Sequence, residues 1–125
     1  MNSHEEAFVT AFVEPRRQER FLGFLKDPKK RRKLINEFDH LKSGFLSGKF
    51  MTRLQGTESL PPHAYQTLRK LGAPENCWAM GGRFDGQEKE LLYALQESGD
   101  GFVLSCVPGK LAYMKTEDDE YILRR

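Results

Sequence analysis

Residues 102–115 have the sequence FVLSCVPGKLAYMK, and this stretch decides the fold class. Two mainly apolar runs, residues 102–107 and 110–115, flank the pair Pro108-Gly109. A Pro-Gly pair between two such runs is typical of a tight type II turn, because proline fixes φ at the first central position and glycine accepts the positive φ of the second. We therefore expect an antiparallel β-hairpin here.

Further elements are expected on both sides of the hairpin. The acidic run at residues 117–120 predicts another turn, followed by a third strand at residues 121–123. Before the hairpin, residues 77–82 are predicted to form a short strand, and residues 85–98 have the apolar spacing of a helix that ends at Gly99. The second half of the sequence is therefore expected to contain an antiparallel meander and one helix.

The first half is predicted to be helical. Helices are expected at residues 5–13, 15–26, 28 to about 43, and 62–71. Asp27-Pro28 indicates a helix start, because aspartate caps free backbone N–H groups and proline is tolerated in the first helical turn. Gly72 marks the end of the last of these helices, since glycine is common in the left-handed conformation just past a helix end.

Two of these helices have a clear apolar side. The helix at residues 15–26 has Phe21, Leu22, Phe24 and Leu25 on one side. The next helix has apolar residues at i, i+4, i+7 and i+11, which is one stripe of a 3.6-residue period. This stripe consists of Leu34, Phe38, Leu41 and Phe45.

The expected fold is a single α+β domain over residues 1–125, with the element order ααα-β-α-β-β-β. The N-terminal helices are expected to pack on one face of a small, mostly antiparallel C-terminal sheet of three or four strands. Within the domain we expect a basic helical part at about 5–43, a loop at about 44–62 and a mixed α/β part at about 62–125. Glycines and prolines break the periodicity in that loop.

Length and composition restrict the class of protein. A chain of 125 residues with 38% hydrophobic residues can bury its own core. The sequence has no apolar run near the ~18 residues of a membrane span, and its first residues are acidic, so we expect a cytoplasmic protein with no membrane partner. Cys77 and Cys106 have no Cys/His cluster beside them, and therefore no metal or other cofactor is predicted.

Charge is distributed unevenly along the chain. Residues 15–33 contain nine lysines and arginines but only two carboxylates, a net charge of +7. Because the whole chain carries +2, the remaining residues together carry −5. A basic block beside an acidic remainder favours contact with an anionic partner.

Five consecutive cations occupy residues 29–33, in the first turns of the helix after Pro28. At about 100° per residue they point around the whole helix, so at least one is expected to turn toward the protein. The helix dipole disfavours each cation there by a few tenths of a kcal/mol, and this unfavourable placement points to an anionic partner. If the two basic helices form a hairpin, the preceding helix adds its arginines to the same surface. The candidate anion-binding residues are Arg16, Arg17, Arg20, Lys29, Lys30, Arg31, Arg32 and Lys33.

The preferred hypothesis is a small non-enzymatic binding or regulatory protein whose basic helices contact the phosphates of nucleic acid. The alternative is a protein-interaction module that docks the same surface on an acidic protein. A third hypothesis is a small enzyme or ligand-binding protein that uses Cys106, the turn at residues 81–85 and a histidine. The sequence offers His4, His40 and His63, and because no local motif supports them, no catalytic residue is assigned. Both binding hypotheses require the cations to form one outward face without neutralising carboxylates; otherwise their long side chains cover apolar surface while the charged ends reach water.

The two cysteines are expected to be free and buried. If the helix at residues 85–98 joins parallel neighbouring strands, the two thiols lie at opposite strand ends, about 16 Å apart at ~3.3 Å per residue. That distance excludes a disulfide. An antiparallel pairing of the two strands is the alternative that brings Cys77 and Cys106 together.

Overall fold

A six-stranded antiparallel sheet forms the centre of the protein, in a computed structural model that describes residues 2–36 and 45–125. The strands are β1 (Met51–Arg53), β2 (Asn76–Gly81), β3 (Gln87–Glu90), β4 (Phe102–Val107), β5 (Leu111–Lys115) and β6 (Glu120–Arg124). They lie in the order β1-β6-β5-β4-β2-β3, and each neighbouring pair is antiparallel. The predicted α+β class is confirmed, and the sheet has six strands rather than the expected three or four.

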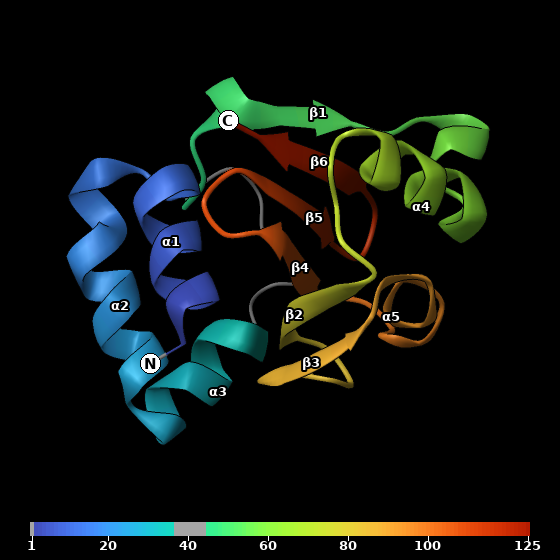
Figure 1. The fold of residues 1–125 in the computed structure, drawn as a ribbon. Helices are drawn as coiled ribbons and strands as arrows, with labels where there is room; N and C mark the ends of the chain where they lie inside the picture. Colours follow the sequence, from blue (N-terminus) through green and yellow to red (C-terminus); the bar gives the residue numbers. More distant parts are fainter. Residues whose placement is uncertain (1, 37–44) are drawn as a thin grey trace.

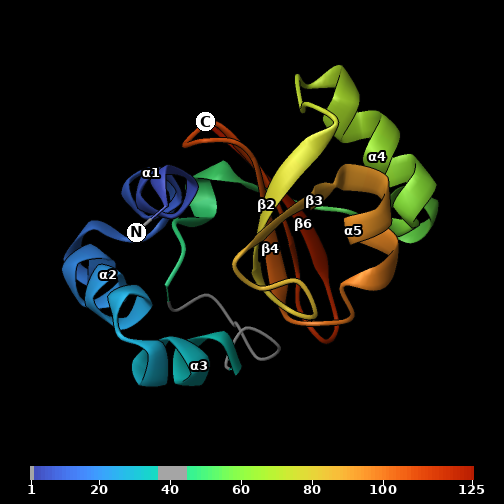
Figure 2. The ribbon, with the colours of Figure 1, turned by 60° about the horizontal axis from the view of Figure 1, so that its bottom comes forward.

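Helices cover both faces of this sheet (Figures 1 and 2). The N-terminal layer packs on one face, as expected. Its elements are α1 (Ser3–Phe12), the 3₁₀ turn η1 (Pro15–Arg17), α2 (Gln18–Lys26) and α3 (Pro28–Asn36). The second layer, on the other face, consists of α4 (Pro61–Lys70) and α5 (Leu91–Glu97). Two further 3₁₀ turns, η3 (Gly48–Phe50) and η4 (Gly56–Ser59), lie on either side of β1 in the chain.

Local sequence signals set several helix boundaries. The Oδ1 of Asp27 accepts a hydrogen bond of 3.0 Å from a backbone N–H in the first turn of α3, as the capping prediction requires. Gly72 has a φ of 111° just past the end of α4, which confirms the predicted helix end. Of the predicted stripe on the third helix, Leu34 is buried. Phe38 and Leu41 lie outside the described residues.

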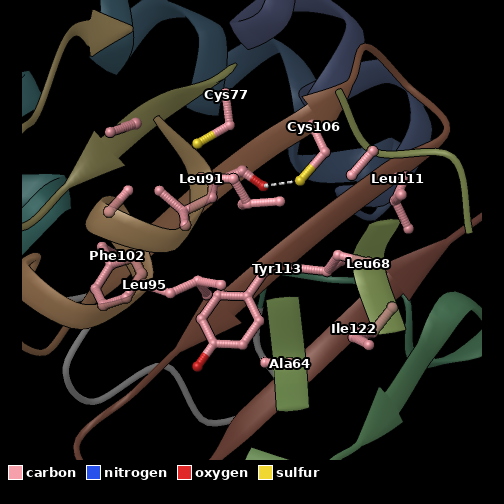
Figure 3. Packing of buried hydrophobic residues seen from close by; sticks show 14 of the residues in the cluster. Ala64, Leu68, Cys77, Leu91, Leu95, Phe102, Cys106, Leu111, Tyr113 and Ile122 are labelled. Carbon is pink, nitrogen blue, oxygen red and sulfur yellow. Dashed lines mark hydrogen bonds between the residues drawn. The ribbon is translucent and has the colours of Figure 1, made fainter. Parts of the chain in front are cut away.

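Side chains alternate along each strand, and both faces of the central strands β4 and β5 are buried. In β4, Phe102, Leu104 and Cys106 pack against the layer of α4 and α5 (Figure 3). Val103, between them, packs against the N-terminal layer instead. A strand buried on both sides has a continuous apolar run rather than an alternating one, and residues 102–107 show this pattern.

The sequence does not predict the two edge strands, β1 and β3. β3 lies within the predicted helix at residues 85–98; the helix begins only at Leu91, where Glu90 caps it by accepting a hydrogen bond of 2.8 Å from a backbone N–H. The sequence of β3, QEKE, is entirely polar and therefore has no apolar period. β1 lies within the predicted loop at residues 44–62 and pairs with β6, so tertiary pairing rather than local propensity forms it.

Cys77 and Cys106 lie on neighbouring antiparallel strands, because β2 pairs with β4 and Trp78 is opposite Ser105. The strands therefore adopt the antiparallel alternative, and the parallel arrangement with widely separated thiols is wrong. Both cysteines are free and buried, as predicted, and their side chains point into the core beside α5 (Figure 3). Burial raises the pKa of Cys77 to about 12 and also raises the pKa of Cys106 above its ordinary value.

Candidate anion-binding surface

η1, α2 and α3 bring four of the predicted anion-binding residues around one pocket. These residues are Arg16 and Arg17 of η1, Arg20 of α2 and Lys33 of α3. The pocket has a volume of about 500 Å³, within the range of about 300–1,000 Å³ that is typical of small-molecule sites. α2 and α3 pack against each other as the predicted hairpin, and this packing places the two groups of cations together.

Aromatic rings lie between the cations of this pocket. The guanidinium carbon of Arg17 is 5.8 Å from the centroid of the Phe45 ring. That of Arg20 is 5.4 Å from the centroid of Phe24. At such distances a cation is attracted to the ring face, which holds its long side chain in place. The apolar side chains of the described residues that line the pocket are Phe21, Phe24, Leu34 and Phe45.

Three further predicted cations extend the positive charge along α3. The side chains of Lys29, Lys30 and Arg32 are exposed. We call the seven outward residues the cationic surface: Arg16, Arg17, Arg20, Lys29, Lys30, Arg32 and Lys33. None of the seven forms an ion pair with a carboxylate in the part of the chain that the structure describes. For these seven, the requirement that no carboxylate neutralises them is met among the described residues, whereas the requirement of one common outward face stays a prediction.

Arg31, the remaining predicted residue, faces the protein. Its Nη1 and Nη2 donate hydrogen bonds of 2.7 and 2.9 Å to the two carboxylate oxygens of Glu5 on α1. Its Nε and Nη2 donate hydrogen bonds of 3.2 and 2.8 Å to Asp85, in the turn between β2 and β3. The expectation that one cation of the run turns inward is thus confirmed. The guanidinium of Arg31 is hydrogen-bonded to carboxylates from both halves of the chain.

The contacts of Arg31 anchor α3 to the rest of the molecule. Glu5 is only 3% exposed, and its Oε2 also accepts a hydrogen bond of 2.8 Å from the indole N–H of Trp78 on β2. Asp85 accepts a second hydrogen bond of 2.8 Å, from the backbone N–H of Gly81. The hydrogen bonds with Glu5 make the largest contribution to raising the pKa of Arg31 above its ordinary value, and those with Asp85 raise it further. This network fixes the direction in which the exposed side chains of α3 point.

The sheet separates Cys106 from His4, two residues of the enzyme hypothesis. The Nδ1 of His4 is 2.8 Å from the Oγ of Ser105, and consecutive residues of a strand point to opposite faces. His63 is exposed on α4, whereas Cys106 is 2% exposed; His40 lies outside the described residues. Burial raises the pKa of the Cys106 thiol, so it remains protonated and is a poor nucleophile.

The aromatic part of the pocket is not evident from the sequence, where Phe24 and Phe45 fit the apolar faces of the expected helices. In the structure both rings remain partly exposed. Arg20 and Phe24 are four residues apart, a spacing that puts both on one helix face, and this is the available sequence signal for the pair. No local signal exists for Phe45, which reaches Arg17 through the tertiary structure.

Comparison with known protein families, curated proteins and solved structures gives no match for this chain. Within residues 2–36 and 45–125, no helix has the length and apolar character needed to cross a bilayer. Those residues also lack any group of three or more histidine, cysteine or acidic side chains that could hold a metal ion. Function is therefore inferred from the cationic surface and its pocket.

Proposed function

We propose that this protein is a non-enzymatic binding or regulatory protein of the cytoplasm that contacts nucleic acid through the cationic surface. The observation that carries the proposal is the convergence of cations from η1, α2 and α3, none of them paired with a described carboxylate. By contrast, Arg53, Arg69 and Lys115 on other elements each form an ion pair with a carboxylate. Other exposed cations, such as Lys70 and Lys110, also lack an ion pair among the described residues, so what distinguishes this surface is that η1, α2 and α3 bring several unpaired cations together.

Unpaired cations at these positions destabilise the helix that carries them. Lys29 and Lys33 are four residues apart, and like charges at this spacing cost about 0.2–0.5 kcal/mol. Lys29 and Lys30 also lie in the first turn of α3, where the helix dipole disfavours positive charge. An anionic partner would remove both effects and would accept charge-assisted hydrogen bonds from the same side chains. The charge distribution thus favours a bound state over the free protein.

The spread of the cationic surface favours a chain of phosphates over a single anion. Its residues extend from η1 across α2 to the first turns of α3. Exposed lysines and arginines neutralise phosphates and release counterions without reading the sequence. We expect binding that depends strongly on salt and weakly on nucleotide sequence. An acidic protein offers similar charges and is the alternative that the experiment must distinguish.

Fluorescence anisotropy with labelled oligonucleotides, measured between ~50 and ~200 mM NaCl, tests the proposal. For a single strand, the slope of log K against log salt is expected to be about −0.7 for each phosphate that the protein neutralises. The variant Arg16→Ala/Arg20→Ala/Lys33→Ala removes three cations of the pocket. It is expected to bind more weakly, with a slope shallower by about 2.

A matched control removes three exposed cations from other elements, as Lys70→Ala/Lys110→Ala/Arg124→Ala. Both triple variants change the formal net charge from +2 to −1, so general charge attraction is equal in the two. The control is expected to keep the wild-type slope. Equal losses in both variants would contradict the proposed surface. Binding of the wild type to polyglutamate, with no binding to nucleic acid, would replace the proposal with the acidic-protein alternative.

A further inference from the structure

The pocket within the cationic surface is lined in part by aromatic rings. Binding of phosphates alone would not use these rings. We propose that this pocket receives an unpaired nucleobase, and that the protein therefore prefers single-stranded nucleic acid to a duplex. This inference rests on the function proposed above and names the class of nucleic acid. Charge, shape and free hydrogen-bond donors in the pocket each support it.

The charge of the lining indicates an anionic occupant. Arg16, Arg17, Arg20 and Lys33 line the pocket, and no carboxylate of the described residues does so. Lys29 and Lys30 are exposed and precede Lys33 by four and three residues, a spacing that puts them on the same side of α3 as this pocket residue. A nucleotide within a strand fits this arrangement, because its base enters the pocket while the phosphates on either side remain at the surrounding cations.

The shape of the apolar lining favours a flat occupant. Among the described residues, the apolar side chains that line the pocket are Leu34 and the rings of Phe21, Phe24 and Phe45. Bases of single strands stack on aromatic rings and on guanidinium planes, which is how proteins hold them without reading sequence. In a duplex the bases are already paired and stacked on one another, so no base face is free to stack on the rings of the pocket. A preference for single strands follows from this difference.

The arginines of the pocket retain free hydrogen-bond donors. Within the described chain, neither Arg17 nor Arg20 donates a side-chain hydrogen bond, and the Nε of Arg17 is buried without a partner. Arg125 provides the contrast, because it lies 4.9 Å from the Phe50 centroid and also donates a hydrogen bond of 3.1 Å to the carbonyl of Ala11. The pair of Arg125 and Phe50 is internally satisfied, whereas the pocket arginines keep donors for a phosphate beside the stacked base.

The test compares three labelled probes of equal length, about 12 nucleotides, at ~50 mM NaCl: a deoxythymidine strand, a strand of abasic nucleotides and a duplex. The two single strands carry the same phosphates and differ only in their bases. We expect the deoxythymidine strand to bind about 5- to 150-fold more tightly than the abasic strand, which is the effect of one stacked base. The duplex is expected to bind more weakly than the deoxythymidine strand.

Two ring variants locate the effect. Phe24→Leu keeps apolar volume but removes a ring of the pocket, and it is expected to abolish most of the difference between the deoxythymidine and abasic strands. Phe50→Leu makes the same substitution in the satisfied pair and is expected to keep the full difference. Phe45→Leu provides a second pocket variant if urea unfolding shows that Phe24→Leu does not fold.

The outcomes separate this inference from the proposed function. Equal affinity of the wild type for the deoxythymidine and abasic strands overturns the base pocket but leaves phosphate binding intact. Equal effects of Phe24→Leu and Phe50→Leu also overturn it. Displacement of the strand by a long-chain carboxylate but not by thymidine monophosphate would assign the pocket to an anionic amphiphile instead. Failure to bind any of the three probes overturns both proposals.

Discussion

The two helical layers of the protein differ in the charged side chains that they present. The layer of α4 and α5 covers the sheet with an apolar cluster that includes both thiols, and its Arg69 pairs with Glu75 at 3.1 Å. The N-terminal layer contains an apolar cluster too, but adds the Arg31 network and the cationic surface. One layer mainly stabilises the sheet, while the other also presents positive charge that the described residues do not balance.

The same contrast recurs within the run of cations on α3. The side chain of Arg31 pairs with two carboxylates, whereas the side chains of Lys29, Lys30, Arg32 and Lys33 form no ion pair in the described chain. Adjacent residues of one helix thus have separate roles, one in stability and the others at the surface. Substitutions of single residues can test whether these roles are separate.

The largest expected effect is on stability, from breaking the Arg31 network. Arg31→Met leaves Glu5 buried without its cation, and removing one partner of a buried ion pair costs about 3–5 kcal/mol. Lys30→Met, on the exposed side of the same helix, is expected to change the free energy of unfolding by less than about 0.5 kcal/mol. Urea unfolding measures both. Similar values for the two variants would show that Arg31 is a surface cation like its neighbours.

The second prediction concerns the thiols in the layer of α4 and α5. Because burial raises the pKa of Cys77 from 9.0 to about 12, its thiolate fraction at ~pH 8 is about 1,000-fold lower in the folded protein. Alkylation by iodoacetamide is expected to be slower in the native protein than in the protein unfolded in urea. The expected difference is of similar size to the change in thiolate fraction. The unfolded thiols ionise near pH 9 and the folded ones above it, so stability is expected to fall as the pH rises above ~9. Rapid alkylation of the native protein would contradict the buried placement.

A smaller effect is expected from reversing charge at the start of α3. Lys29→Glu and Lys30→Glu put negative charge at the positive end of the helix dipole, which should raise the free energy of unfolding by about 0.3–1 kcal/mol each. The same substitutions are expected to weaken oligonucleotide binding. Lys110→Glu, outside α3, is the control. It is expected neither to raise the free energy of unfolding nor to weaken oligonucleotide binding. A loss of stability together with unchanged binding would argue that these lysines serve the fold.

The smallest effect is expected at His4, where the N-terminal layer meets β4. Burial lowers the pKa of His4 below its ordinary value, so the unfolded state binds more protons as the pH falls below ~6.5. The stability due to neutral His4 is thus retained above that pH and lost as the pH falls through the folded-state pKa. His4→Gln is expected to make stability less dependent on pH between ~7 and ~5 than in the wild type. His63→Gln, which removes an exposed histidine from α4, controls for the number of histidines.

Much of the fold could be predicted from the sequence because several elements have strong local signals. Residues 102–115 combine two apolar runs with a Pro-Gly turn, and Asp27 and Gly72 mark helix boundaries through capping and positive φ. The edge strands lack such signals, since β3 is polar and β1 is formed by its pairing with β6. The antiparallel pairing of β2 with β4 was likewise one of two possibilities, because strand order depends on the whole chain.

The candidate site was predictable in composition but not in arrangement. Helical geometry requires that one cation of residues 29–33 turn inward, but its identity depends on Glu5 and Asp85, which lie far from α3 in the sequence. The pocket likewise requires the packing of α2 on α3 and the position of Phe45. Local patterns indicate charge and amphipathic faces, whereas the separation of Arg31 from its neighbours comes from tertiary contacts.

The most direct test of the central claim is to map the contact surface by ¹H–¹⁵N NMR during titration with a deoxythymidine oligonucleotide. We predict that amide shifts concentrate in η1, α2, the first turns of α3 and Phe45, with α4 and α5 unchanged. Shifts centred on α4 and α5, or a spectrum unchanged even at ~50 mM salt, would contradict the claim that the unpaired cations of the N-terminal layer form a nucleic-acid-binding surface.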